Sequence, residues 1–144
     1  MAERVTRRMR AQVFQRANGC CEYCRSQALY TTESFDVEHI VPTVRGGPTV
    51  LDNLALACSN CNGHKYDKFE AYDAVSEQTI SLFHPRRDKW SEHFAWREDK
   101  TQIIGLTPTG RVTIELLTMN AQNLMNWRRV MLQAGQHPPD DVQE

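Results

Sequence analysis

The sequence predicts an α+β protein in which a cysteine-rich finger follows an N-terminal helix and precedes a small C-terminal antiparallel sheet plus helix. Apolar residues recur at helical spacing near both ends of the chain, and short or alternating apolar runs lie between them. Two C-x-x-C pairs enclose the first of these runs. A chain of 144 residues, 40% of them hydrophobic, is long enough to bury a core. We therefore expect residues 1–78, with the helix and finger, and residues 79–144, a β-rich extension, to pack as one globular unit.

The elements expected in the first half follow from apolar spacing and stop signals. Residues 4–17 carry apolar side chains at every fourth position, and Asn18-Gly19 is a left-handed stop, which together predict an amphipathic helix. The alternating segment 34–41 and the short apolar run 54–57 are expected to be strands. A helix is expected over 59–69, directly after the second strand.

The second half is expected to hold a small sheet and a final helix. Leu124, Trp127 and Met131 recur at helical spacing between Asn120, a capping residue, and Gly135, a stop signal. A Thr-Pro-Thr-Gly sequence at 107–110 is expected to be the hairpin turn between the last two strands. The segments rich in β-branched and aromatic residues, and therefore expected to be strands, are 79–83, 93–97, 102–106 and 111–117.

Charge is distributed unevenly behind a net charge of −1. Residues 1–16 hold five arginines and one acid, whereas residues 33–78 hold eight acids and three basic residues. The basic arm could bind phosphates, and the acidic centre would repel a polyanion unless bound cations offset it. The alternative for the arm is the solvated face of a helix. No apolar run approaches the roughly 20 residues of a membrane helix, and the N-terminus lacks a secretory signal, so we expect no membrane partner and a cytoplasmic location.

The cysteine pairs Cys21/Cys24 and Cys58/Cys61 are separated by 33 residues. Each pair can supply two thiolates on one knuckle, and four thiolates around a tetrahedral ion form a closed structural zinc site. A redox-active pair or two unrelated pairs of buried cysteines are the alternatives. Cys20 is expected to lie beside the site without being a ligand, because Cys21 has the correct spacing to Cys24.

The residues between and around the knuckles resemble the HNH endonucleases over about residues 10–68. The resemblance implies a ββα-metal, treble-clef-like finger stapled by zinc, and it implies cleavage of DNA phosphodiester bonds that leaves a 3′-hydroxyl. The matching positions are Glu38-His39, Pro42, Gly46-Gly47, Asn53-Leu54, Cys58-x-x-Cys61, Asn62 and Lys65.

By this resemblance, His39 is the general base, and Glu38 with Asn62 holds a catalytic Mg²⁺ or Mn²⁺. Oxygen ligands such as these suit hard cations. Asn53 is expected to fix the backbone around His39. His64 is the alternative to Asn62, because two positions along a helix turn about 200° and both cannot face one ion. The chain departs from the commonest pattern at Glu38, where Asp is more usual, and at Asn62, where many members have His.

The sequence therefore predicts a metal-dependent DNA endonuclease. Its rival is a non-catalytic zinc-binding module that binds nucleic acid or protein. A further basic group, Arg86, Arg87 and Lys89, is either an extension of the DNA-binding surface or a solvated loop. The residues expected to contact DNA are Arg7, Arg8, Arg45 and Lys65.

Overall fold

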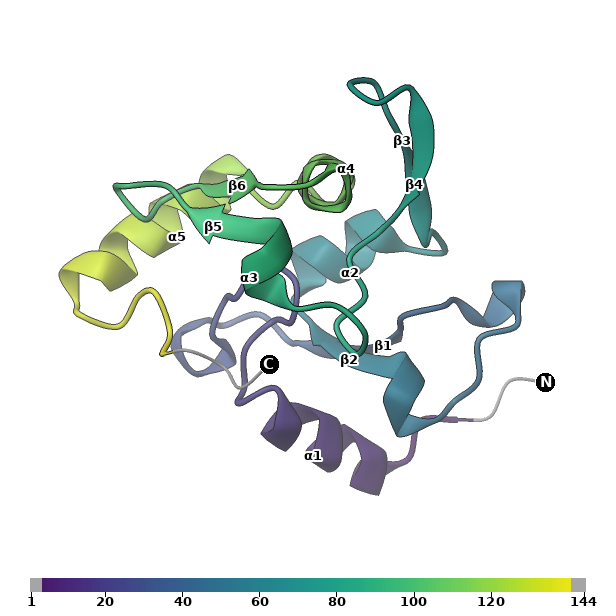
Figure 1. Cartoon of the computed structure of the whole chain (residues 1–144). Helices are drawn as coiled ribbons and strands as arrows, with labels where there is room; N and C mark the ends of the chain where they lie inside the picture. The colour runs from purple at the N-terminus through teal and green to yellow at the C-terminus, as the bar shows by residue number, and fades with distance from the viewer. Residues whose placement is uncertain (1–3, 141–144) are drawn as a thin grey trace.

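The computed structural model describes residues 4–140 and shows an α+β fold of five α-helices and three two-stranded antiparallel sheets within that range (Figure 1). Three short 3₁₀ helices connect some of these elements: η1 (Ala28–Tyr30), η2 (Thr43–Arg45) and η3 (Leu51–Asn53). The helices and strands are α1 (Arg7–Arg16), β1 (Asp36–His39), β2 (Leu54–Ala57), α2 (Ser59–Lys65), β3 (Glu70–Asp73), β4 (Gln78–Ser81), α3 (Trp90–His93), β5 (Phe94–Trp96), β6 (Ile103–Gly105), α4 (Pro108–Leu117) and α5 (Gln122–Gln133).

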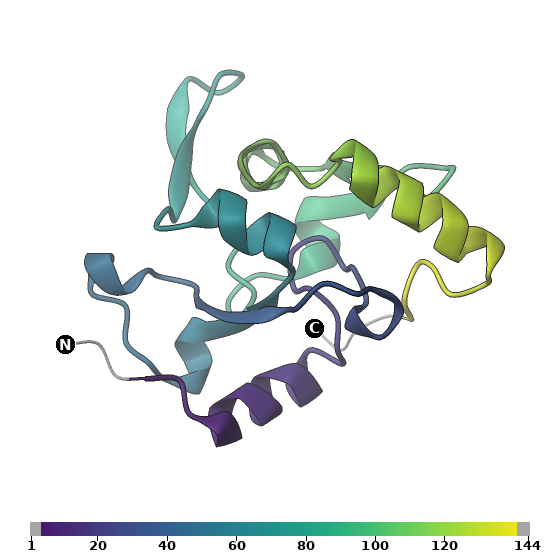
Figure 2. The ribbon, with the colours of Figure 1, turned by 180° about the vertical axis from the view of Figure 1, so that it is seen from behind.

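The finger consists of the β1–β2 hairpin with one helix on each face. In Figure 1 and Figure 2, α1 lies on one side of the hairpin and α2 on the other. Leu54 and Leu56 of β2 pack with Val13 of α1, whereas Ala55 and Ala57 belong to the larger core together with the cysteines. Successive residues of a strand face opposite sides, so a four-residue strand serves both cores. The strand expected over 34–41 is confirmed over Asp36–His39, and the strand expected over 54–57 is confirmed at the same residues.

Helix α1 begins and ends at the local signals that the sequence contains. The Thr6 hydroxyl accepts a hydrogen bond from the Met9 backbone N–H at 3.1 Å, which caps the first turn. Asn18 and Gly19 have φ values of 55° and 69°, the left-handed conformation that ends a helix. The expected helix over 4–17 is thus confirmed over Arg7–Arg16.

The expected strand over 111–117 and its turn at 107–110 are wrong, because this segment forms α4. The Thr107 hydroxyl accepts from the Gly110 backbone N–H at 3.0 Å, and Pro108 occupies the first turn, where a missing N–H costs nothing. A Cβ added to Gly110 would lie 2.1 Å from the carbonyl oxygen of His93, so glycine permits α4 to approach that backbone closely. Thr-Pro-Thr-Gly is therefore a helix start, and packing overrides the β-propensity of the residues after it.

Other boundaries also differ from expectation. The final helix is confirmed, but it begins at Gln122, and Asn120 does not cap it. The Asn120 side chain instead accepts from the Ile103 N–H and donates to the Ile103 carbonyl, both at 2.8 Å. Helix α2 ends at Lys65, and β3 pairs with β4 in a hairpin that projects from the body (Figure 1).

One core cluster contains side chains from both parts of the chain, including Tyr23 and Ala55 from the first and Phe83 and Phe94 from the second. The β3–β4 hairpin spans the expected boundary between residues 78 and 79. The division into two parts stays a prediction. Within residues 4–140, no helix is long and apolar enough to cross a bilayer.

Candidate active site and metal centre

The four cysteines of the two knuckles form one buried cluster. The sulfur atoms of Cys21, Cys24, Cys58 and Cys61 lie within 4.8 Å of one another, and Cys24 Sγ is 3.5 Å from Cys58 Sγ. Cys58 precedes α2 and caps it, because its sulfur accepts from the Cys61 N–H at 3.4 Å. Cys20 lies outside the cluster, and its thiol donates to the Asn18 carbonyl at 3.6 Å. The set of four sulfur donors fits a closed zinc site.

The surroundings of these thiols shift their pKa values in different directions. Burial raises the pKa of the Cys21 thiol well above its usual range. A hydrogen bond with Cys21 is the largest cause that raises the pKa of Cys61 well above its usual range. A hydrogen bond with Cys21 is also the largest cause that holds the pKa of Cys24 well below its usual range. Zinc binds thiolates, so binding would release the protons that Cys21 and Cys61 retain.

A buried arginine adds positive charge near the cluster. Arg128 is 1% exposed, and its guanidinium donates to uncharged oxygens, the carbonyls of Thr101 and Met119 and the amide oxygen of Asn120. Burial lowers the pKa of Arg128, and the four cysteine thiols act in the opposite direction. Its positive charge would offset part of the negative charge of the four thiolates that a bound zinc ion requires.

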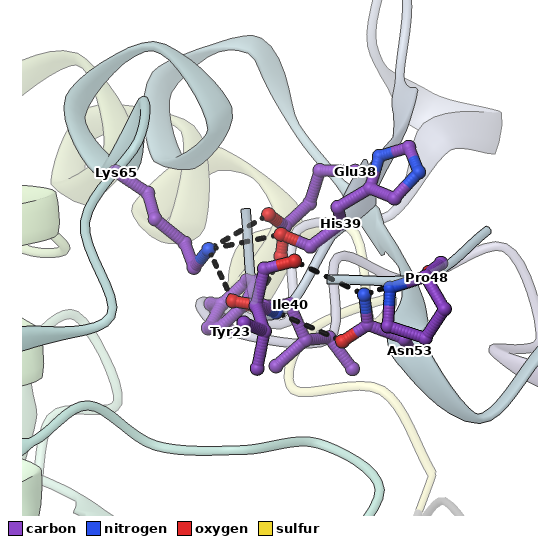
Figure 3. Close-up of polar contacts among 8 residues, drawn as sticks. Tyr23, Glu38, His39, Ile40, Pro48, Asn53 and Lys65 are labelled. Carbon is purple, nitrogen blue, oxygen red and sulfur yellow. Dashed lines mark hydrogen bonds and ion pairs between the residues drawn. The ribbon is translucent and has the colours of Figure 1, made fainter. Parts of the chain in front are cut away.

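Glu38 and Lys65 form a buried ion pair between β1 and α2. Lys65 Nζ is 2.9 Å from Glu38 Oε2, and the two side chains are 5% and 1% exposed for Glu38 and Lys65 respectively. The ammonium also donates to the carbonyls of His39 at 3.2 Å and Ile40 at 2.8 Å, and the Tyr23 hydroxyl donates to Glu38 Oε1 (Figure 3). Both oxygens of Glu38 thus have protein partners.

Lys65 was expected to contact DNA, but its side chain is 1% exposed and its ammonium group is directed into the protein. All three donors of its ammonium group are used inside the protein. Burial raises the pKa of Glu38, and Lys65 opposes that shift. The pKa of Tyr23 is also raised well above its usual range, first by burial and then by the Glu38 charge.

His39 stands at the end of β1 with a half-buried imidazole. Figure 3 shows the ring directed away from the contact between Glu38 and Lys65. Its Nε2 atom is hydrogen-bonded to the Thr49 hydroxyl at 2.8 Å. Burial, followed by the charge of Lys65, lowers the pKa of His39 below its ordinary value of 6.5, which favours the neutral imidazole at pH 7. A neutral, partly accessible imidazole can accept a proton.

Asn53 holds together the loop that returns from His39. Its side chain accepts from the Val41 N–H at 2.9 Å and donates to the carbonyls of Val41 at 3.0 Å and Pro48 at 2.9 Å (Figure 3). A Cβ on Gly47 would lie 1.7 Å from the Val41 carbonyl oxygen, so only glycine fits the closed loop. These contacts connect the backbone after His39 to the segment that carries Thr49.

On α2, Asn62 contacts β1 and His64 does not take part in that contact. Asn62 Nδ2 donates to Asp36 Oδ2 at 3.2 Å, whereas His64 Nδ1 is 2.7 Å from the Asn60 carbonyl of its own helix. Asn62 therefore lies beside Asp36, whereas the partners of Glu38 are Tyr23 and Lys65.

Sequence reasoning missed Asp36, Thr49 and Tyr23 as members of this region. Asp36 lies two residues before Glu38 and so on the same face of the strand, which is a signal that alternation provides. The contacts of Tyr23 and Thr49 depend on how the chain folds back. The expected DNA contacts Arg7 and Arg8 are exposed on α1.

Arg45 is exposed at the end of η2, with its guanidinium 5.5 Å from the centre of the Phe69 ring. Contact of this residue, Arg7 or Arg8 with DNA stays a prediction.

Comparison with known proteins gives one family. Searches of curated proteins and of solved structures returned no match. The family model described as HNH endonuclease matches residues 21–68, about a third of the chain. The matched segment begins at the first cysteine of the cluster and includes β1, β2 and α2. The chain thus contains a segment that matches the HNH endonuclease model and is built around a four-cysteine cluster.

Proposed function

We propose that the protein is a DNA endonuclease that hydrolyses phosphodiester bonds with His39 as general base and with Mg²⁺ or Mn²⁺ as its expected cofactor. The observation that carries the proposal is the half-buried imidazole of His39, hydrogen-bonded to Thr49, within the segment that matches the HNH endonucleases. An HNH segment indicates nuclease-type activity in general and makes nucleic acid the expected substrate.

The chemistry assigned to His39 is one proton transfer. The imidazole accepts a proton from a water molecule as the water oxygen attacks phosphorus. The bond from phosphorus to the 3′ oxygen breaks, its electron pair stays on that oxygen, and a solvent proton completes the 3′-hydroxyl. Thr49 orients the ring through the contact to Nε2, and Asn53 fixes the backbone around it. A positioned base of this kind contributes roughly 10²–10⁴ in rate.

The two expected metals differ in how well the residues fit them. Cys21, Cys24, Cys58 and Cys61 fit zinc, which would hold the two knuckles together and supply folding energy. Glu38 and Asn62 do not form an open pair of oxygen ligands for Mg²⁺, because both carboxylate oxygens of Glu38 are bonded, one to Lys65 and one to Tyr23, and the Asn62 amide nitrogen donates to Asp36. We therefore assign no step to the divalent ion.

The buried ion pair favours the second candidate function, a non-catalytic zinc-binding module for nucleic acid or protein. Glu38, which was expected to hold a catalytic ion, instead bonds Lys65 and Tyr23, as a structural residue of the finger would. In that case His39 would be a packing residue beside Thr49.

Nicking of supercoiled plasmid tests the proposal. Wild-type protein, His39→Ala and His39→Gln are compared in Mg²⁺, in Mn²⁺ and in EDTA, with zinc content and melting temperature measured for each. His64→Ala is the matched control, since this exposed histidine bonds its own helix. Nicking by the wild type and control, lost in both His39 variants at equal zinc content, supports the endonuclease. Equal nicking by His39→Ala, or none by the wild type in either cation, favours the binding module.

A further inference from the structure

We propose that a basic cleft between α1 and the connection from β4 to α3 binds the phosphodiester backbone of nucleic acid. The inference deepens the proposed endonuclease and rests on it for the identity of the ligand. The cleft has a volume of about 430 Å³. Five cationic side chains line it: Arg16, Arg25, Arg86, Arg87 and Lys89.

Only the tertiary structure brings these five residues together. Arg16 ends α1, Arg25 follows the first cysteine knuckle, and the other three lie in the connection between β4 and α3. In Figure 1 and Figure 2 this connection runs from β4 down to β2. The connection thus places Arg86, Arg87 and Lys89, which belong to the C-terminal part of the chain, next to the finger.

Three of the cations are held in place before any ligand binds. Arg16 donates to the carbonyls of Leu51 at 3.0 Å and Leu54 at 2.6 Å. Arg86 forms an ion pair with Glu22, and the Arg25 guanidinium lies 5.1 Å from the centre of the Trp90 ring. Charges that are already ordered cost less conformational entropy on binding. Arg87 and Lys89 are exposed and complete the cleft with cations free to approach a ligand.

The acids of the cleft do not cancel this charge. Three carboxylates line it against five cations. Glu22 bonds Arg86 and accepts from the Leu56 N–H at 2.8 Å, and Asp88 accepts from the His84 N–H at 2.9 Å. Burial, followed by the nearby charge of Arg16, lowers the pKa of Arg86 to about 10. The positive charge of Arg16 thus acts on Arg86, and a bound anion would lessen this repulsion.

The walls of the cleft favour phosphate over bases. Phe83 and Trp90 are 2% and 8% exposed, and both rings pack against Phe94. They cannot serve as stacking platforms for unpaired bases. An arginine guanidinium can donate two parallel hydrogen bonds to two oxygens of one phosphate. Contacts to the phosphate backbone of DNA position a duplex without reading its sequence. Asp52 on the wall adjoins Asn53, so a strand held in the cleft lies next to the loop that supports His39.

Equilibrium binding without cleavage tests the cleft. The full-length, zinc-loaded protein is titrated into a labelled DNA duplex in EDTA-free buffer without Mg²⁺ or Mn²⁺, and anisotropy is recorded at several salt concentrations. The test variant is Arg87→Ala with Lys89→Ala. The control is Arg97→Ala with Arg129→Ala, which removes two exposed cations that do not line the cleft.

We expect the slope of log K against log salt to fall by about 1.8 in the test variant, at about 0.9 per phosphate contact, and to stay unchanged in the control. Equal slopes and affinities in the two variants would overturn the proposal that the cleft binds the DNA backbone. Wild-type protein that binds no DNA, or that binds inorganic phosphate alone, would also overturn it. Binding that depends on the cleft in a protein that never nicks plasmid would refute the endonuclease and leave the cleft standing.

Discussion

Replacement of Lys65 by Met tests whether the Glu38–Lys65 pair is part of the folding core. The side chains are 1% and 5% exposed and the charged atoms are 2.9 Å apart. Removal of the ammonium leaves Glu38 with Tyr23 alone and takes a donor from the carbonyls of His39 and Ile40. Loss of one partner of a buried pair costs about 3–5 kcal/mol. For a chain of this length we expect the melting temperature to fall by roughly 10–20 °C.

The dependence on pH identifies the carboxylate as the cause. Burial already raises the pKa of Glu38 above its ordinary value of 4.5, and Lys65 is the largest influence that lowers it. Without Lys65 the folded-state pKa rises further. When the pKa of a carboxyl group is higher in the folded state than in the unfolded state, the group lowers the free energy of unfolding at every pH at which the unfolded chain is ionised. The loss of stability in Lys65→Met is therefore small below pH 4.5. It grows as the pH rises through the folded-state pKa of Glu38. Glu38→Gln combined with Lys65→Met removes the unpaired charge and recovers part of the loss at pH 8.

The assay is urea unfolding followed by far-ultraviolet circular dichroism, with zinc present and at pH values from 5 to 8. Lys68→Met is the matched control, because it removes an exposed lysine three residues away. The reasoning is refuted if Lys65→Met is as stable as the control at pH 8. A loss of DNA affinity without a loss of stability would instead return Lys65 to the DNA-binding surface.

Three further predictions concern the metal centre and the proposed chemistry. Cys61→Ser should lose zinc and fold poorly, because structural zinc supplies roughly 10–16 kcal/mol of apparent binding energy. Elemental analysis should find about one zinc per wild-type chain, and a wild-type protein that is folded without zinc would contradict this prediction. His39→Ala should lower the nicking rate by roughly 10²–10⁴ while the zinc content stays constant. The nicking rate of the wild type should fall as the pH drops through the lowered pKa of His39, because the imidazole becomes protonated there. A nicking rate that rises toward acidic pH would contradict the assignment of His39 as general base. Asn62→Ala should lower nicking no more than His64→Ala does, because the Asn62 amide donates to Asp36 and Glu38 bonds Lys65 and Tyr23; a loss in Asn62→Ala that added Mg²⁺ partly restores would instead make Asn62 a metal ligand.

The sequence by itself determined the parts of this protein that depend on local signals. Cys21/Cys24 and Cys58/Cys61 predicted a four-sulfur cluster, because each C-x-x-C pair forms a knuckle within one turn of chain. Asn18-Gly19 predicted the end of α1, since a left-handed stop needs no distant partner. The apolar run 54–57 predicted β2 at the same residues.

Tertiary structure decided what depends on partners far apart in the sequence. Glu38 was expected to bind a metal ion, yet a lysine 27 residues later reaches its carboxylate from α2. Residues 111–117 have β-propensity, but the capping residue Thr107 and the close approach of Gly110 to the His93 carbonyl allow a helix there. The basic cleft joins arginines 70 residues apart, Arg16 and Arg86. A sequence pattern reports the preferences of neighbouring residues, whereas the partner of a buried charge is set by the packing of whole elements.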